Sequence, residues 1–536
     1  MHHLSTIAVR VRQSRWSFSI LTGVCALAAI IISFLMGRNQ SLWFDEQYSL
    51  LICSKPVRQM LALTAVDAHP PLYYLLLKTW MTLVDGNVAM LRLLNCIFLG
   101  ATVGIMALLV RSLYGRRVAV ACLPLLLCGG FILRYGYELR MYSLAMLLVV
   151  FGTYALLRAT GSIPAHTQSS TASDTTESLS HHHIHGWHAV YALTVALGMY
   201  TLYLTALVWI THVLWLFICS WKDSHESTVV SRLRKLSAFR WIPIYFVSII
   251  LYLPWIPSLF GQMGHPVLPP VRRSMNMTGL ANAFDAILLG RTESSMPSMA
   301  SLLALSIGIA VIVRLSIAKP HDRAFLLIAT LFVVPLLMMT IWSAVRELVS
   351  NGYGFFSVRY LSFTAPFLYI ALALLCLHSP AIRLRTSRLL YAVVLLTLFA
   401  GTMVFATQGN YNFDRADTPG TARLAQQVRC SKAHPVVAQD EYTYIDAYWY
   451  FRDCPAYYFL DDKDVPTRGG YAPLHDSAAQ LHNINNLKTD NFTLLSWSKL
   501  HDTKYDALLK SKIWKRGTVT RVNGNASVLY RSKLID

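Results

Sequence analysis

Two adjacent carboxylates stand out in a chain that has few acidic residues. Asp45 and Glu46 occur in the stretch SLWFDEQYSL, in a 536-residue chain with 27 Asp and Glu against 47 Lys and Arg. A positioned carboxylate can act as a general base and take the proton from a hydroxyl group as that group attacks a substrate. The alternative is a solvated loop in which Asp45 caps the start of a helix.

Three other segments carry residues that could share in such chemistry. The segment DAHPP contains Asp67 and His69, and RYGYELRMYSL contains Glu138, Arg140 and Tyr142. Glu138 and Arg140 could instead form a simple salt bridge at the membrane interface. The third segment, SVRYLSFTAP, contains Arg359, whose planar and permanently charged guanidinium suits a phosphate group. A purely structural role for Arg359 is the alternative.

The elements that must position these residues are membrane helices. Hydrophobic residues make up 55% of the chain and charged residues only 14%, whereas a soluble chain has about 25% charged residues. The first uncharged stretch, 17–36, has about the length that a helix needs to cross a bilayer. The formal charge of +20 does not indicate nucleic acid, because most Lys and Arg residues lie in short clusters between apolar runs.

These basic clusters predict the topology. If all of them are cytosolic, as the positive-inside rule requires, the N-terminus is cytosolic and the C-terminus extracytosolic. The chain then has about eleven spans, at 17–36, 90–110, 118–133, 141–158, 188–201, 203–220, 241–260, 299–316, 324–344, 358–377 and 389–407. The segment 159–187 has no Lys or Arg, so its side of the membrane follows only from its neighbours, and the division of 188–220 into two spans is left open.

One apolar run is too short to be a span. Residues 71–84 would form a helix of roughly 21 Å, less than the ~30 Å hydrocarbon core. Its Tyr, Trp and Lys residues suit a helix lying in the outer membrane surface. Residues 37–88 therefore form one external loop of a membrane domain, 1–407, and this loop carries Asp45, Glu46, Asp67 and His69.

The polar tail, 408–536, predicts a small extracytosolic α/β domain. Its segment from His434 to Asp462 indicates a strand, a helix around Ile445–Phe451 and a second strand at Ala456–Leu460. Cys430 and Cys454 both fall in this domain. A disulfide between them suits the oxidising side of a membrane, and two free buried thiols are the alternative.

The segment 166–188 is of low complexity and falls almost entirely within the predicted loop 159–187. It includes a histidine cluster, but no spacing with Cys or carboxylates supports a metal site. We expect a disordered cytosolic loop. No metal site and no certain cofactor are predicted, although a divalent cation is left open.

Five motifs in order resemble one family. They are WFDEQYS, DAHPPLYYLLLKTW, MLRLL (90–94), YELRMYSL (137–144) and RYLSFTAP (359–366), within residues 17–377. The chain resembles the integral-membrane glycosyltransferases of the C-type fold, in the branch of protein O-mannosyltransferases and lipid A aminoarabinose transferase. It is most similar to bacterial dolichyl-phosphate-mannose-protein mannosyltransferase-like members.

The resemblance implies an inverting sugar transfer on the outer face of the cell membrane. The donor would be a polyprenyl-phosphate-linked sugar, because no phosphate-cradling glycine loop for a nucleotide sugar is present. The acceptor would be a lipid, glycan or protein hydroxyl. Asp45 would be the base and Glu46 a helper. Arg359, Arg140 and His69 would bind the donor phosphate, although His69 could merely cap the surface helix, and Glu138, Asp67 and Tyr142 would contact the acceptor.

Two alternatives remain open at this stage. Many spans with a few external charges also fit a transporter or lipid flippase, but such proteins carry internal repeats or midplane charges that this sequence lacks. An enzyme that moves a preformed glycan rather than a single sugar has the same sequence features. The sugar, the acceptor and the polyprenol are not specified by the sequence.

Overall fold

The computed structural model describes residues 15–162, 176–223, 241–264, 277–289, 323–349, 356–377, 384–407 and 418–532, the last with gaps at 460–464, 476, 483–486, 488, 498–513 and 523–524. Its contacts divide the chain into two compact units. Unit 1 comprises Met1–Arg38, Asn87–Ile256 and Pro270–Thr407. Unit 2 comprises Asn39–Gly86, Pro257–Pro269 and Gln408–Asp536, and so combines most of the expected external loop with the C-terminal tail.

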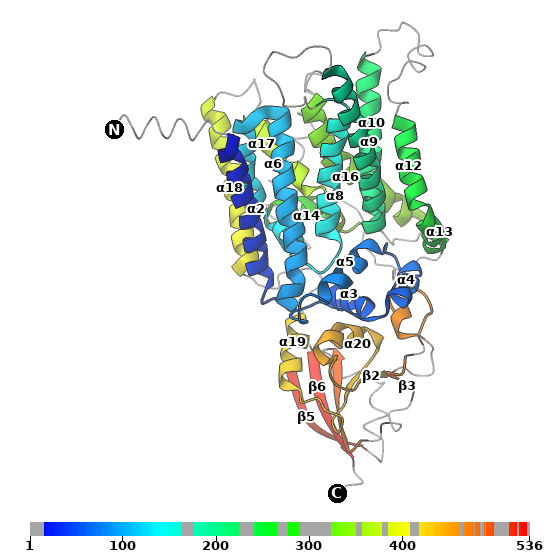
Figure 1. Ribbon diagram of the computed structural model, residues 1–536. Helices are drawn as coiled ribbons and strands as arrows, with labels where there is room; N and C mark the ends of the chain where they lie inside the picture. The colour runs from blue at the N-terminus through cyan, green and yellow to red at the C-terminus, as the bar shows by residue number, and fades with distance from the viewer. Residues whose placement is uncertain are drawn as a thin grey trace. The chain divides into compact units, whose positions relative to one another are not determined.

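Unit 1 is helical, and its long helices run side by side (Figure 1). Neighbours in space include α2 with α6, α6 with α8, α8 with α9, and α9 with α12. Further neighbours are α10 with α16, α16 with α17, and α17 with α18. The elements are α2 (Arg15–Gly37), α6 (Val88–Leu127), α7 (Gly130–Tyr135), α8 (Tyr142–Ala159), α9 (Thr176–Thr201), η1 (Tyr203–Thr205), α10 (Ala206–Asp223), α12 (Ile242–Tyr252), η3 (Leu253–Trp255), α14 (Met277–Leu289), α16 (Arg323–Val349), η4 (Val358–Leu361), α17 (Ala365–Leu377) and α18 (Leu384–Thr407).

Seven helical segments in the described part of the chain are long and apolar enough to cross a membrane. They are Ser17–Gly37, Val88–Leu127, Tyr142–Ala159, Tyr203–Trp221, Ile242–Met263, Arg323–Val349 and Arg385–Met403. Two shorter apolar helices, Gly279–Leu289 and Ala365–Leu377, accompany them. The protein is therefore a multi-pass integral membrane protein. The expected span at 299–316 lies outside the described residues, and the orientation of the termini stays a prediction.

A basic turn divides α6 into two helices. Gly115 has φ 82° and ψ 174°, a conformation that costs glycine little because it has no Cβ. The separate spans expected at 90–110 and 118–133 meet at this break. The adjacent Arg116 donates a hydrogen bond to the Ser17 hydroxyl, and Arg111 lies 4.6 Å from the Phe18 ring centre. This basic cluster thus lies at the end of the bundle where α2 begins.

Residues 188–220 divide into two helices, α9 and α10, near the expected point, but of the two only α10 is among the described helices long and apolar enough to cross a membrane. Leu202 interrupts the helix with φ −157° and ψ 120°. At its other end α9 begins at Thr176, earlier than expected and inside the predicted loop 159–187. Residues 163–175 of that loop lie outside the described part of the chain.

A buried polar chain joins four helices of unit 1. Hydrogen bonds link Thr153 Oγ1 to His212 Nε2 (3.1 Å) and His212 Nδ1 to the Tyr191 hydroxyl (2.9 Å). The Tyr191 hydroxyl also bonds the Tyr245 hydroxyl at 2.8 Å. These side chains come from α8, α10, α9 and α12, and each hydrogen bond between helices adds to the packing that holds membrane helices together.

Unit 2 begins with three short helices, α3 (Phe44–Ser54), α4 (Val57–Ala65) and α5 (Leu72–Met81). Helix α5 occupies the run expected to lie on the membrane surface, and its 10 residues are too few to cross a bilayer. Lys78 of α5 donates hydrogen bonds to the carbonyl oxygens of Cys53 (2.9 Å) and Lys55 (2.8 Å). Because a helix C-terminus leaves carbonyls unpaired and carries partial negative charge, this ammonium fixes α5 to the end of α3.

The tail forms a mixed six-stranded sheet in the order β3-β2-β1-β4-β6-β5. Strands β3, β2, β1 and β4 pair in parallel, and β4, β6 and β5 pair antiparallel. The predicted strand, helix and strand are confirmed as β1, α20 with η5, and β2. Bounds are α13 (Ile256–Gly264), α19 (Thr418–Gln427), β1 (Val436–Ala438), α20 (Glu441–Ala447), η5 (Tyr448–Phe451), β2 (Ala456–Phe459), η6 (Ala472–Leu474), β3 (Gln480–Leu481), β4 (Asn491–Trp497), β5 (Trp514–Val522) and β6 (Asn525–Ser532).

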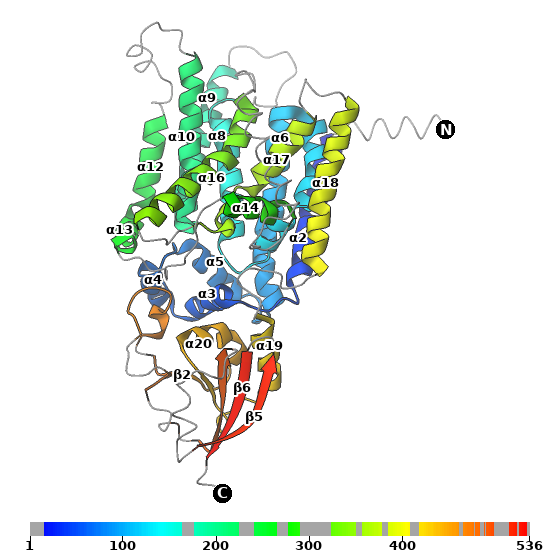
Figure 2. The same cartoon turned by 180° about the vertical axis from the view of Figure 1, so that it is seen from behind.

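Both faces of the sheet are buried, because consecutive apolar residues of the central strand β1 point to opposite faces. Val436 packs with Ala447 of α20 and Phe451 of η5, and α20 lies next to the strands in Figures 1 and 2. Its neighbour Val437 packs on the opposite face with Phe492 and Trp514. Successive strand residues face opposite ways, so the apolar run in this strand predicts burial on both sides.

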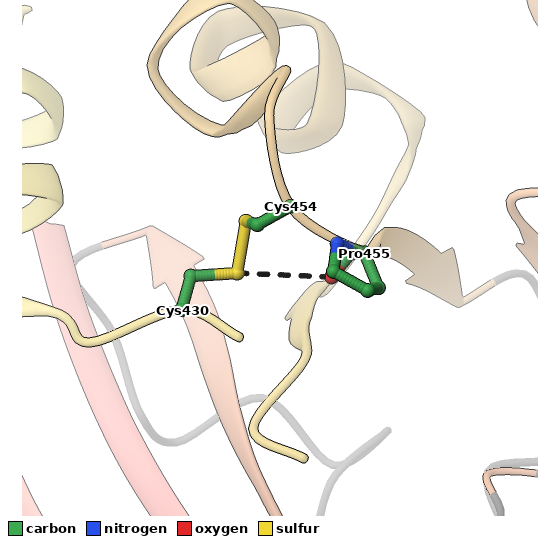
Figure 3. Close-up of a disulfide and its surroundings, with 3 residues drawn as sticks. All are labelled: Cys430, Cys454 and Pro455. Carbon is green, nitrogen blue, oxygen red and sulfur yellow. Dashed lines mark hydrogen bonds between the residues drawn. A yellow bond between two sulfur atoms is a disulfide. The ribbon is translucent and has the colours of Figure 1, made fainter. Parts of the chain in front are cut away.

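Cys430 and Cys454 form the disulfide left open by the sequence (Figure 3). Their Cα atoms are 6.0 Å apart. The 3.9 Å contact drawn from Cys430 Sγ to the Pro455 carbonyl oxygen is a van der Waals contact, because a disulfide sulfur has no proton to donate. The bridge closes a loop that contains α20 and η5.

Candidate functional site

Asp45 and Glu46 lie in the first turn of α3, within unit 2. Asp45 is half-buried, and Glu46 is 0% exposed. The backbone N–H of Trp43 donates to Glu46 Oε2 at 3.4 Å, so Glu46 closes the start of its own helix. Negative charge in a first turn also interacts favourably with the helix dipole. The two carboxylates therefore differ in surroundings, as expected for adjacent positions that point about 100° apart.

Aromatic rings surround the start of α3. The Phe44 ring stacks on Tyr442, with centres 4.5 Å apart and planes 9° apart, and meets Tyr471 edge-on at 6.4 Å. Burial raises the pKa of Tyr471 to about 12, with Glu441 and Asp440 contributing to the rise. Tyr471 therefore stays a neutral hydroxyl at physiological pH.

Asp67 and His69 follow α4 in the same unit. Asp67 is 5% exposed, and His69 is half-buried. Two distant segments hold this region: Gln262 donates to the carbonyl oxygens of Thr64 (2.9 Å) and Ala65 (3.2 Å). The backbone N–H of Gly469 also donates to the Val66 carbonyl oxygen at 3.0 Å. The segment with Asp67 and His69 thus belongs to a fixed structure rather than to a free loop.

Glu138, Arg140 and Tyr142 lie in unit 1, in a segment that is buried throughout residues 129–146. Glu138 is 0% and Arg140 3% exposed. Arg134, which the sequence analysis did not single out, is 3.8 Å from the Glu138 carboxylate. A buried charge is costly without a partner of opposite sign, and Arg134 supplies such a charge for Glu138.

Asn95 on α6 fixes the shape of this buried segment. Its Nδ2 donates to the carbonyl oxygen of Glu138 and to that of Arg140 at 2.9 Å. Arg92, one turn earlier, donates to the Gly37 carbonyl oxygen at 2.6 Å and lies 5.7 Å from the Tyr137 ring centre. Arg92 lies within the motif MLRLL and Asn95 directly follows it, but neither role can be predicted from the sequence, because the hydrogen-bond acceptors are backbone carbonyl groups.

Neighbouring side chains also pack closely against Gly136. A Cβ at this position would lie 2.4 Å from Leu99 Cδ2 and 2.8 Å from Ser33 Oγ, so a larger residue would require these side chains to shift. The Ser33 hydroxyl donates to the Leu133 carbonyl oxygen at 2.7 Å. Tyr142 is 1% exposed, and its ring meets that of Tyr135 at 5.2 Å.

Arg359 lies on the short helix η4, also in unit 1. It is half-buried among buried neighbours, and its guanidinium is 5.6 Å from the Tyr360 ring centre. Helix η4 packs on α14 and α16, and the Phe356 N–H donates to the Ser343 hydroxyl of α16 at 3.2 Å. The expected span 358–377 is thus a 3₁₀ turn followed by α17, which has only 13 residues.

The predicted residues therefore fall into two sets. Asp45, Glu46, Asp67 and His69 belong to unit 2, whereas the other four belong to unit 1. Within unit 1, Glu138, Arg140 and Tyr142 share one buried segment, and Arg359 lies on a different element. Within the described residues, no three His, Cys, Asp or Glu side chains come together as a metal site requires.

This architecture is similar to that of ArnT. The crystal structure of ArnT from Cupriavidus metallidurans in the apo state aligns with a TM-score of 0.57 and 12% identity, over 94% of this chain and 97% of ArnT. The structure of the same protein bound to undecaprenyl phosphate aligns with the same TM-score and identity, over 96% and 98%. The chain therefore has an ArnT-like fold over 94–96% of its length.

Other comparisons add little to this result. The archaeal oligosaccharyltransferase AglB from Archaeoglobus fulgidus, in complex with an inhibitory peptide and a dolichol-phosphate, aligns with a TM-score of 0.46 and 12% identity, over 97% of this chain and 75% of AglB. No family model and no curated protein sequence matches the chain.

Proposed function

We propose that the protein is an inverting glycosyltransferase. It moves a sugar from a polyprenyl-phosphate donor to a lipid, glycan or protein hydroxyl on the outer face of the membrane. The observation that carries this proposal is the ArnT-like fold along 96% of the chain, since ArnT has been crystallised with undecaprenyl phosphate. That fold also favours a transferase over the transporter that the sequence left open.

Asp45 is the proposed base. Its carboxylate takes the proton of the acceptor hydroxyl as the hydroxyl oxygen bonds to the anomeric carbon of the donor. The bond from that carbon to the phosphate oxygen breaks on the opposite face, so the configuration inverts. Half-burial of Asp45 at a helix start, beside a Glu46 already used as a helix cap, supports this division of roles.

The leaving group is the polyprenyl phosphate, which departs with the electron pair of the broken bond. Its charge needs electrostatic stabilisation more than a proton. Arg359 is the proposed principal partner of this phosphate, with Arg140 and His69 as further contacts. A half-buried arginine on a short helix, packed between two longer helices, has the fixed orientation that phosphate recognition needs.

Glu138, Asp67 and Tyr142 are the proposed acceptor contacts, and Glu46 helps to orient the base. The fold alone does not distinguish branches of C-type glycosyltransferases. Motif order favours the branch of protein O-mannosyltransferases and aminoarabinose transferase.

The test is transfer from a lipid-linked donor. Purified protein is incubated with radiolabelled polyprenyl-phosphate sugars and a membrane extract, and the label is followed into lipid, glycan and protein fractions. We expect label to leave the lipid-linked donor and appear in one acceptor fraction. Transfer only from nucleotide sugars would contradict the lipid donor, and transport of the labelled lipid without transfer would favour a flippase.

A further inference from the structure

The glutamine that follows the carboxylate pair connects α3 to the C-terminal tail. Gln47 is 0% exposed. Its Nε2 donates to the Asp446 carbonyl oxygen at 2.8 Å, and its Oε1 accepts from the Trp449 backbone N–H at 2.9 Å. A carbonyl on one side and an N–H on the other fix which way the amide must face.

Both backbone partners lie where α20 changes into the 3₁₀ helix η5. Helix ends leave N–H and carbonyl groups without partners in the helix, and buried backbone groups need a hydrogen bond. Gln47 supplies one bond to each. A side chain that only donated, or only accepted, would satisfy one of them and leave the other unpaired.

Other contacts join the same two segments on either side of Gln47. The Leu42 backbone N–H donates to the Tyr450 hydroxyl at 2.7 Å, and Phe44 stacks on Tyr442. At the far end of α3, the Tyr448 hydroxyl donates to the Ser54 hydroxyl at 2.9 Å. The contacts therefore extend along the whole of α3.

The positions of these contacts on α3 constrain its rotation. Residues 44 and 47 are three apart and lie on one side of a helix. At about 100° per residue, Asp45 is about 160° from Gln47 around the axis. The tail therefore contacts the side of α3 that lies opposite Asp45. None of these hydrogen bonds involves the side of the helix that carries Asp45.

We infer that Gln47 is a positioning residue through which segment 440–450 of the tail sets the orientation of α3. The consequence for Asp45 rests on its proposed role as the base. In this view the tail is part of the catalytic machinery without supplying a group that touches the substrate. The tail acts by holding α3 in one rotation about its axis, and this rotation sets where the Asp45 side chain points.

The test combines one functional and one structural measurement on Gln47→Leu, which keeps the approximate size and loses both hydrogen bonds. We expect kcat to fall about 10²-fold, as displacement of a catalytic group by about 1 Å can cause, with KM for the donor nearly unchanged. We also expect faster amide hydrogen exchange in residues 44–54. Tyr450→Phe, which removes only the bond to Leu42, should show a smaller change in both. The exposed Gln59 of α4 gives the matched control Gln59→Leu, which should change neither.

Gln47→Glu is a second variant, in which protonation of the new carboxyl group should restore both hydrogen bonds. A side chain that only filled space would show no such dependence on pH. Ionised, its carboxylate can accept from Trp449 but repels the Asp446 carbonyl. Protonated, the acid donates and accepts as the amide does, and burial favours this neutral form. Exchange protection of α3, compared with wild type at each pH, should therefore return as the pH is lowered.

The outcomes separate this inference from the proposed function. Unchanged exchange protection in Gln47→Leu would overturn the inference, whatever the enzyme transfers. Lost protection with an unchanged kcat would also overturn it, because α3 would then not orient the base. Absence of transfer by the wild type from every lipid-linked donor would instead contradict the proposed function, and the exchange measurement would still decide how α3 is held.

Discussion

The Glu46 carboxylate accepts a hydrogen bond from the backbone N–H of Trp43 and closes the first turn of α3. One member of the carboxylate pair thus has a structural task that its neighbour does not share. A glutamine at this position would keep a carbonyl oxygen for the same bond. This difference makes the two carboxylates separable by experiment.

Asp45→Asn should abolish most turnover and leave donor binding largely intact. The amide keeps the size of the side chain but has no basicity, and loss of a positioned base typically lowers the rate by about 10²–10⁴. Single-turnover transfer and donor-binding assays on the same preparation check this. Glu46→Gln is the matched variant, with a smaller loss expected. An active Asp45→Asn beside an inactive Glu46→Gln would exchange the two roles, and full activity in both would direct the search for the base to Asp67 or Glu138.

Arg359→Lys should weaken use of the donor by one to two orders of magnitude, roughly 1.4–3 kcal/mol. Lysine keeps the charge but loses the planar pair of donors that fits a phosphate. The measurement is kcat/KM with a defined polyprenyl-phosphate sugar. The exposed Arg385 of α18 offers the control Arg385→Lys, which should behave as wild type. Equal kinetics for both variants would leave Arg359 a structural residue.

Asn95→Leu should destabilise unit 1. The change removes the donor that serves the buried carbonyls of Glu138 and Arg140, and each unpaired buried group costs about 1–3 kcal/mol. Thermal unfolding in detergent should shift down by several degrees. Ser112→Ala on the same helix removes only an exposed bond to Leu108 and should shift it little. Equal midpoints for the two variants would show that Asn95 does not hold the segment.

Asp85→Cys tests which side of the membrane carries the loop after α5. Asp85 is exposed, so an impermeant thiol reagent added outside intact cells should label it. The nearby native thiol should not interfere, because Cys53 is 1% exposed and burial raises its pKa. The wild type gives the background labelling. Reaction only after the membrane is opened would place this loop in the cytosol and require a new topology.

Reduction of the disulfide should destabilise unit 2. The bridge spans a sequence separation of 24, and a closed loop of about this length stabilises by about 3 kcal/mol. A reductant should lower the thermal midpoint of the wild type but not that of the double variant Cys430→Ser with Cys454→Ser. No effect of reductant on the wild type would contradict a stabilising bridge.

The sequence predicted features whose signals are local. The strand, helix and strand of the tail follow from short-range periodicity, and the basic clusters mark the ends of spans. The break at Gly115 was placed correctly between two spans, although the positive φ itself is not visible in a sequence. The short α17 was predicted too long, because the apolar run continues upstream through η4, which is also buried.

The contacts of Gln47 and Asn95 could not be predicted in this way. Each side chain binds backbone groups, and any residue type can supply a backbone carbonyl or N–H. Nothing in the segment around Asp446 therefore identifies it as the partner of α3. For the same reason the sequence does not reveal that residues 39–86 of the expected external loop share a compact unit with the tail.

The hydrogen-bond partners of α3 are also synthesised much later than α3 itself. The bonds of Gln47 and Leu42 join residues separated by 399, 402 and 408 positions. At about 5–20 residues per second, a ribosome needs on the order of 20–80 s to make the intervening chain. Helix α3 is therefore synthesised long before these hydrogen-bond partners exist. Residues 446–450 complete the surroundings of α3, so a chain that ends before them would contain the membrane helices and leave Asp45, the proposed base, on a helix without these hydrogen-bond partners.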